Sequence, residues 1–172
     1  IYTVVVTNAG GCSTTSAAFT VVVKPLPLAV ITPAGSTSFC AGKNVLLKAS
    51  TGTNYTYQWI RGAAVIPNAV QSSYAATLPG QYTVIVTNAS GCAVTSAGIP
   101  VSVTPLPAAL ITPAGALTFC AGQTVSLKAN TGTNYTYQWK KGQVNIPGAT
   151  LVNYTASASG LYSVVVTNAA GC

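Results

Sequence analysis

A repeat with a period of 80 runs through this 172-residue chain and constrains its fold more than any other feature. Residues 25–92 and 105–172 are identical at about 41 of 68 aligned positions. Similarity this high between neighbouring segments indicates duplication without much functional divergence, as in repeat arrays. The residues that recur at this interval are Cys12, Cys92 and Cys172; Cys40 and Cys120; Trp59 and Trp139; and Tyr2, Tyr82 and Tyr162.

The repeat predicts three segments. Residues 1–24 would be the C-terminal strands of a preceding repeat, residues 25–104 a complete repeat, and residues 105–172 a repeat that lacks its last strand. A Pro-Leu-Pro sequence opens the second and third segments and predicts a short stiff linker. A sheet edge without its last strand is prone to aggregation. We therefore expect either that the polypeptide continues or that another chain supplies the missing strand.

Within residues 25–104 the patterns predict short strands and no helix. Val45, Leu47 and Ala49 alternate with Leu46 and Lys48, which is the period of a half-buried strand. Turn residues recur roughly every 8–12 positions, and about seven such strands are typical of an immunoglobulin-like sandwich. The predicted fold class is all-β, with tandem immunoglobulin-like β-sandwiches of about seven strands each. The expected strands are 29–40 (broken at 33–35), 45–49, 55–61, 64–66, 73–77, 81–87 and 93–103.

The same pattern predicts the core. Trp59 follows Leu47 at the spacing where the core tryptophan of the third strand is expected. Tyr82 comes two positions before Val84, as in a tyrosine corner. Leu47 and Val84 would then occupy the positions that form the inter-sheet disulfide of antibody domains. The expected core comprises Leu47, Trp59, Tyr82 and Val84, with their repeat counterparts Leu127, Trp139, Tyr162 and Val164.

The chain resembles a known family in the combination of its motifs. These are Phe39-Cys40-Ala41-Gly42, Tyr57-Gln58-Trp59 and Thr87-Asn88-Ala89-Ser90-Gly91-Cys92, together with Gly80, Tyr82 and Val84. The combination resembles the Ig-like and PKD-like tandem repeats of Bacteroidota-type cell-surface adhesins or extracellular filaments. The resemblance covers the whole chain. It implies secretion to the bacterial cell surface and a role in adhesion, gliding or filament formation. Many members carry Asp in the loop after the tryptophan; this chain carries none, which argues against ion binding.

The chain contains no Asp, no Glu and no His. General acid–base catalysis at neutral pH depends mostly on those side chains, and a Ser or Cys nucleophile normally needs one as its base. Calcium sites require carboxylates and typical zinc sites require His or clustered Cys. We therefore expect no catalytic residue, no metal site and no cofactor, and a protein that is not an enzyme.

The charge pattern argues against nucleic acid as a partner, and the lengths of the apolar runs argue against a membrane span. Nucleic-acid binding usually needs a clustered basic face, whereas the cations here are scattered and only two are adjacent. No apolar run approaches the roughly 18 residues of a membrane-spanning helix, so no membrane span is expected. Acidic glycans or envelope polyanions remain an alternative partner. The seven cations are Lys24, Lys43, Lys48, Arg61, Lys128, Lys140 and Lys141.

The five cysteines imply disulfides in an exported protein. In this fold, Cys40 precedes the second strand and Cys92 follows the sixth, at opposite ends of a domain. They should lie about 20–25 Å apart at roughly 3.3 Å per residue, whereas a disulfide needs Cα atoms within about 7 Å. Between tandem domains, however, the first turn of one faces the sixth–seventh strand turn of the next. The favoured hypothesis is therefore an inter-domain bond between Cys40 and Cys172.

The remaining cysteines would follow the same rule. Cys12 and Cys92 would pair with upstream repeats and Cys120 with a downstream one. Such bonds would clamp the joints between domains into a stiff rod, and each closed loop would add about 4–5 kcal/mol in the chain-entropy model. A bond between Cys40 and Cys92 within one domain, inter-chain bonds and free thiols stay open as alternatives.

The function expected from these features is that of a structural segment of a secreted bacterial surface fibre or adhesin stalk. Its partners would be neighbouring repeats of the same protein and other copies in a filament. A carbohydrate-binding surface module is the alternative, with surface glycans as partner, and would require an exposed aromatic platform. Tyr55, Tyr57 and Trp59 share one strand face, and we interpret that face as core.

Overall fold

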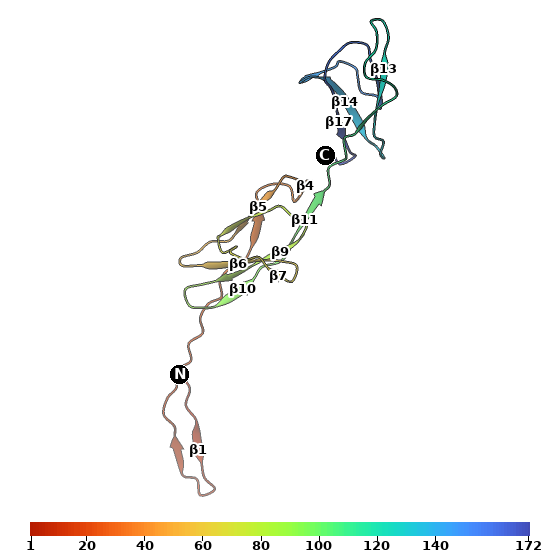
Figure 1. Ribbon diagram of the computed structural model, residues 1–172. Helices are drawn as coiled ribbons and strands as arrows, with labels where there is room; N and C mark the ends of the chain where they lie inside the picture. The colour runs from red at the N-terminus through yellow and green to blue at the C-terminus, as the bar shows by residue number, and fades with distance from the viewer. The chain divides into compact units, whose positions relative to one another are not determined.

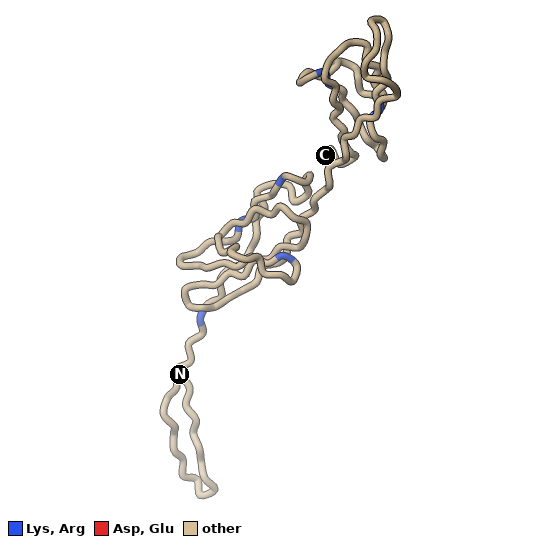
Figure 2. Tube along the Cα trace, in the orientation of Figure 1, with Lys and Arg blue, Asp and Glu red and all other residues tan.

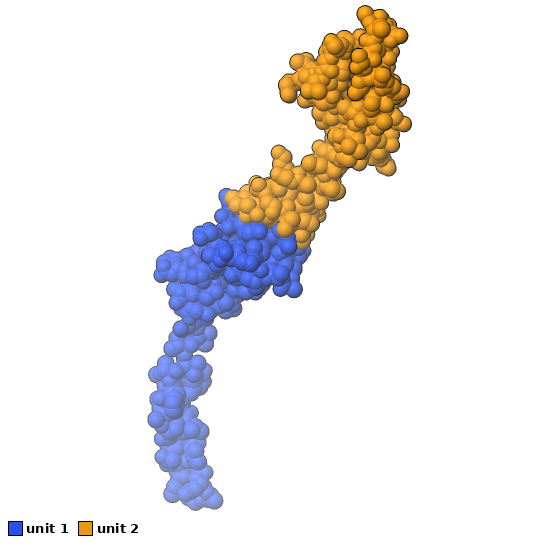
Figure 3. Space-filling model, in the orientation of Figure 1, with its two compact units in different colours: residues 1–32, 47–74, 81–99 blue, residues 33–46, 75–80, 100–172 orange.

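The structure is a computed structural model that describes all 172 residues, and it is all-β, with 17 strands and no helix (Figure 1). Two compact units make up the chain: residues 1–32, 47–74 and 81–99 form unit 1, and residues 33–46, 75–80 and 100–172 form unit 2 (Figure 3). The predicted segments 1–24, 25–104 and 105–172 stay predictions, and each unit is described by itself below.

Unit 1 begins with a two-stranded hairpin of β1 (Val5–Thr7) and β2 (Ser13–Thr15). Its larger part centres on β6 (Thr56–Arg61), which pairs antiparallel with β7 (Ala64–Val65) and with β9 (Gly80–Thr87). Strand β10 (Ala93–Thr95) pairs antiparallel with residues 85–87 of β9. A three-stranded sheet has the order β3 (Ile31–Pro33), β5 (Val45–Ala49), β8 (Ser73–Ala76).

Unit 2 contains a parallel pair and two further sheets. The parallel pair joins β4 (Ser38–Cys40) to β11 (Ile99–Thr104), with Ser102 opposite Ser38 and Thr104 opposite Cys40. One sheet has the order β12 (Ile111–Pro113), β13 (Val125–Ala129), β16 (Asn153–Ala156). The other has the order β15 (Val144–Asn145), β14 (Thr136–Lys141), β17 (Tyr162–Thr167).

The apolar alternation in the sequence matches the alternation of burial in the strands. Strand β5 alternates buried and exposed residues along its whole length, and β9 buries Tyr82, Val84 and Val86. Because successive side chains of a strand point to opposite faces, one face of each strand supplies the core of an immunoglobulin-like sandwich. In residues 105–172 the core draws on both sheets; it consists of Val125, Leu127, Ala129, Trp139, Ala156, Val164 and Val166.

The two tryptophans lie at the centre of this packing. Trp59 and Trp139 are both 0% exposed. The indole N–H of Trp59 donates to Gln71 O, and that of Trp139 donates to Leu151 O, at 2.9 Å in both cases. A buried indole normally needs such an acceptor. One series of ring contacts extends from Trp59 through Tyr74 to Tyr82. Its counterpart extends from Trp139 through Tyr154 to Tyr162. Neighbouring ring centroids are 5.6–5.9 Å apart.

The predicted core residues are located as follows. Leu47, Tyr82, Val84, Leu127 and Val164 are buried. Tyr162 is only half-buried, although it packs against the core and its hydroxyl donates to Ala158 O at 2.8 Å, the bond of a tyrosine corner.

The expected last strand, residues 93–103, is interrupted. It forms β10 and β11, with Ser96, Ala97 and Gly98 between them. The buried Ser96 Oγ accepts from Val84 N at 3.1 Å and donates to Ala97 O at 2.9 Å. The pairing of β10 with β9 ends at Thr95, and the Ser96 hydroxyl then accepts the hydrogen bond of the Val84 backbone N–H.

Candidate functional site

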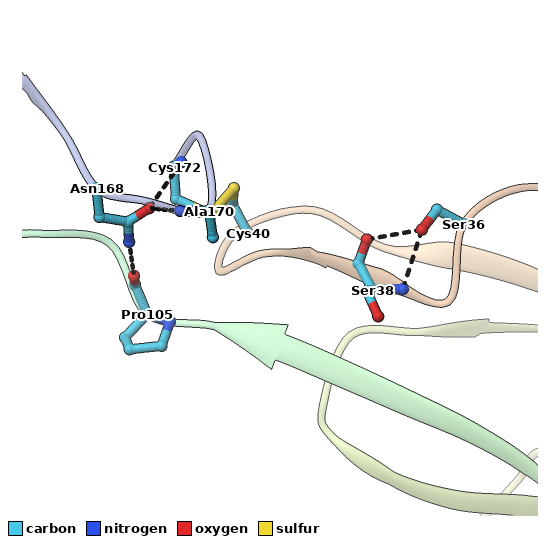
Figure 4. The surroundings of a disulfide bond; sticks show 7 residues. All are labelled: Ser36, Ser38, Cys40, Pro105, Asn168, Ala170 and Cys172. Carbon is cyan, nitrogen blue, oxygen red and sulfur yellow. Dashed lines mark hydrogen bonds between the residues drawn. A yellow bond between two sulfur atoms is a disulfide. The ribbon is translucent and has the colours of Figure 1, made fainter. Parts of the chain in front are cut away.

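A disulfide between Cys40 and Cys172 is the candidate functional site (Figure 4). The two Cα atoms are 5.5 Å apart, inside the usual disulfide range, although the residues are 132 positions apart in sequence. Cys40 belongs to the predicted segment 25–104 and Cys172 to the segment 105–172. This is the pairing that the sequence favoured on grounds of domain topology, and the bond between Cys40 and Cys92 is not formed.

A tight turn holds Cys172 in place. Asn168 Oδ1 accepts hydrogen bonds from Ala170 N at 3.1 Å and from Cys172 N at 3.0 Å. The backbone closes the same turn, because Asn168 N donates to Cys172 O at 2.8 Å. Gly171 has φ of +78°, which a residue with a Cβ rarely adopts. The asparagine side chain, the glycine and the backbone hydrogen bond therefore order the backbone of the turn that ends at Cys172.

The same asparagine also fixes the linker. Asn168 Nδ2 donates to Pro105 O at 3.1 Å (Figure 4). Pro105 directly follows β11, whose last residue, Thr104, lies opposite Cys40 and accepts from Ala41 N at 2.8 Å. A continuous series of contacts thus runs from Cys40 through Thr104, Pro105 and Asn168 to Cys172, and the disulfide closes it into a ring.

Cys40 is held by its own strand and turn. It ends β4, and Cys40 O accepts from Lys43 N at 3.1 Å, with Gly42 at φ of +85° completing the turn. At the start of the strand, Ser36 Oγ accepts from Ser38 N at 3.1 Å and donates to Ser38 O at 2.8 Å. These bonds order the loop that brings β4 alongside β11.

The turn of Asn168 has a counterpart one repeat earlier in the sequence. Asn88 Oδ1 accepts from Ser90 N and from Cys92 N, both at 3.0 Å, and Asn88 Nδ2 donates to Pro25 O at 2.8 Å. Lys24 Nζ adds a bond to Ser90 O at 3.2 Å. Cys92 is therefore held by the same contacts as Cys172, yet it has no disulfide partner within the chain.

Sequence reasoning interpreted the Asn-x-x-Gly-Cys segments only as hairpin turns. It missed that the asparagine also bonds to the linker proline, 63 positions away. The available signal was that asparagine recurs at positions 8, 88 and 168 together with the glycine and cysteine, while proline recurs at 25 and 105.

Three cysteines are free thiols within this chain. Cys12 and Cys120 are exposed and Cys92 is half-buried. Their pairing with neighbouring repeats stays a prediction.

No other cluster of reactive side chains accompanies the disulfide. No group of three or more His, Cys, Asp or Glu lies together in a way that could hold a metal ion. Each buried side-chain nitrogen or oxygen has a hydrogen-bond partner.

The cations are distributed along the chain without an acidic residue between them (Figure 2). The chain also has no helix of the length and hydropathy that a membrane crossing requires.

Comparisons with known proteins find likeness of structure only. No protein-family model matches the sequence, and no curated protein matches it. The human OSCAR ligand-binding domain is 15% identical, with 86% of each chain covered and a TM-score of 0.39. An I-band fragment of titin is 14% identical over 87% of this chain and 63% of that one, with a TM-score of 0.42.

Fibronectin(III)-like modules of CbhA from Clostridium thermocellum are 12% identical over 82% of this chain and 87% of theirs, with a TM-score of 0.36. All three are β-sandwich proteins of the immunoglobulin-like or fibronectin III-like kind. At these identities no function passes from them to this chain.

Proposed function

We propose that this chain is a structural segment of a secreted bacterial surface fibre or adhesin stalk, built from disulfide-stabilised tandem immunoglobulin-like domains. The observation that carries the proposal is the bond between Cys40 and Cys172, which joins residues of two consecutive sequence repeats. A disulfide of this kind belongs to an oxidising compartment, which supports an extracellular location.

The mechanism is mechanical. The covalent bond, the Asn168–Pro105 hydrogen bond and the parallel β4–β11 pair all constrain the same joint. The absence of Asp, Glu and His from the sequence removes the usual proton-transfer groups, which supports a role without catalysis. Neighbouring repeats and further copies of the chain are the proposed partners.

Burial of the tryptophans disfavours the alternative of a carbohydrate-binding module. Sugar stacking needs exposed aromatic faces, whereas Trp59 and Trp139 are inside and Tyr55 and Tyr57 are half-buried. A glycan array probed with the purified chain would reveal such a module by selective binding.

Electron microscopy tests the fibre directly. Gold-labelled antibody against the chain, applied to cells of the producing bacterium, should decorate thin surface projections. The same cells washed with a thiol reductant should show shortened or collapsed projections, because the joints lose their covalent bond. Label confined to the cell interior, or to a smooth surface without projections, would contradict the proposal.

A further inference from the structure

Two turns of the chain carry the same sequence, Asn-Tyr-Thr. It occupies residues 54–56 in one repeat and residues 134–136 in the next. Asn-x-Ser/Thr, in which x is not Pro, is the acceptor sequence for N-linked glycans in exported proteins. The same pattern occurs twice more, at Asn88-Ala89-Ser90 and at Asn153-Tyr154-Thr155. The structure gives these four sites different surroundings.

The first two sites have the same backbone. In each, the N–H of the tyrosine donates to the carbonyl oxygen of the glycine three residues earlier, Gly52 or Gly132, at 3.3 Å. Asn54 and Asn134 are left-handed, with φ of 56° and 57°, a conformation that asparagine adopts more readily than most residues with a Cβ. The tyrosine ring lies against the glycine, in the space that a Cβ there would need. The turn is therefore ordered without the asparagine side chain.

The groups that a glycan transferase uses are accessible in both turns. Asn54, Thr56, Asn134 and Thr136 are exposed. No hydrogen bond of the structure engages the side chain of any of the four. The asparagine amide nitrogen accepts the sugar, and the hydroxyl two residues later completes the acceptor sequence. Both groups are therefore available to an enzyme without any change in the fold.

The site at Asn88 is closed by the turn that contains it. Asn88 is half-buried, and its Oδ1 accepts from Ser90 N and from Cys92 N, both at 3.0 Å. Its Nδ2 donates to Pro25 O at 2.8 Å, so transfer of a sugar to this nitrogen would disturb the contact with the linker. Asn168 makes the same contacts in a sequence without a hydroxyl at the third position. The turn therefore does not depend on the residue that completes the acceptor sequence.

The site at Asn153 is part of a strand. Asn153 and Thr155 belong to β16 and lie opposite Lys128 and Ser126 of β13. Their backbone is extended and paired along the sheet. An acceptor segment has to enter the active site of the transferase, and this one would first have to separate from β13.

We propose that Asn54 and Asn134 carry N-linked glycans in the exported chain, and that Asn88 and Asn153 do not. The asparagine Nδ2 attacks the anomeric carbon of an oligosaccharide carried on a lipid pyrophosphate. The new carbon–nitrogen bond forms as the bond from that carbon to the pyrophosphate oxygen breaks. The lipid pyrophosphate leaves, and the amide nitrogen gives one proton to a base of the transferase. The inference rests on the export that the proposed function includes, and it adds a modification to it.

The composition gives such glycans a physical role. Only 4% of the residues are charged, against about 25% in a typical soluble protein. N-linked glycans are bulky and solubilising, and one at the same turn of each repeat would supply the hydrophilic surface that charges supply elsewhere. Large apolar side chains that are more than half exposed in these repeats include Val65, Val70, Leu78, Val144 and Leu151.

Trypsin separates the four sites, which makes the test direct. The chain is purified from the surface of the producing bacterium, reduced, alkylated, digested and analysed by mass spectrometry. The first and third of the peptides below should carry the mass of an oligosaccharide, located on asparagine by fragmentation, and the other two should have their unmodified masses. Cleavage after lysine and arginine gives one site in each of four peptides: 49–61 (Asn54), 62–128 (Asn88), 129–140 (Asn134) and 142–172 (Asn153).

Two substitutions at one position provide the matched pair. Thr56→Val removes the hydroxyl and keeps the β-branched shape, and peptide 49–61 should lose its glycan completely. Thr56→Ser keeps the acceptor sequence and should keep the glycan. Thr56 is exposed at the first position of β6, so both variants keep the sandwich core. Peptide 129–140 is the control within the same molecule and should be glycosylated in both variants.

Unmodified asparagine in both peptides 49–61 and 129–140 would overturn the proposal. Glycans on Asn88 or Asn153 to the same extent as on Asn54 would also overturn it, since the fold would then not select the sites. A mass addition that persists in Thr56→Val would place the modification on another residue of the peptide. If a parallel digest without reductant still yields the Cys40–Cys172 linkage, the proposed function stands in each of these cases. Absence of that linkage would count against the proposed function instead.

Discussion

At the scale of single residues, Asn168 connects the turn that holds Cys172 to the linker at Pro105. Asn168 combines two accepted bonds within its turn and one donated bond to the linker. An amide is suited to this role because its oxygen accepts and its nitrogen donates. The substitution of aspartate would keep the acceptors and lose the donor, which allows the two roles to be separated experimentally.

Asn168→Ala should expose the turn to solvent exchange. We expect the amide hydrogens of Ala170 and Cys172 to exchange about fivefold faster, since each loses a bond that contributes roughly 1 kcal/mol. Hydrogen exchange measured by NMR would check this. Asn168→Asp should retain protection at both amides while the contact with Pro105 O is lost. Equal exchange in the alanine variant and the native chain would show that the backbone alone holds the turn.

At the scale of the strands, the break between β10 and β11 depends on one hydroxyl. Ser96 is buried, and its hydroxyl is the acceptor for Val84 N. A buried N–H without an acceptor costs roughly 1–3 kcal/mol. Ser96→Ala should therefore lower the free energy of unfolding of the chain by about that amount, measured by urea denaturation.

Ser16→Ala is the matched control. Ser16 makes the same two bonds in the exposed hairpin, where water can replace the hydroxyl. We expect no change in the unfolding midpoint for this variant. If Ser96→Ala were equally neutral, the break between the strands would be fixed by the backbone instead.

The strands show how much of the fold the sequence predicts. Alternation of apolar residues located β5, β9 and the buried faces of both, because a period of two has only one arrangement with the apolar side inward. The break at Ser96 was not predicted, because a serine within a strand looks like an exposed position. Tyr162 was expected in the core and is half-buried, because it lines an open groove. The Asn168–Pro105 bond joins residues 63 positions apart, and no local pattern indicates it.

At the scale of the whole molecule, the disulfide changes which residues bear a pulling force. Cys40 and Cys172 close a loop whose ends are 132 positions apart. When the chain is stretched from its two ends, tension passes through the sulfur–sulfur bond and bypasses residues 41–171. Residues inside the loop then carry no load, whereas β3 and β4 precede or contain Cys40 and stay in the load path.

Single-molecule force spectroscopy should show this directly. With the disulfide intact, stretching should extend only residues 1–40, and Trp139 should stay buried. After reduction, unfolding of the loop should add about 450 Å of contour length, from a sequence separation of 132 at roughly 3.4 Å for each residue. Cys40→Ser should behave like the reduced chain under all conditions. If the oxidised chain released the same additional length, Cys40 and Cys172 would not be bonded in solution, and the joint would rest on hydrogen bonds and strand pairing alone.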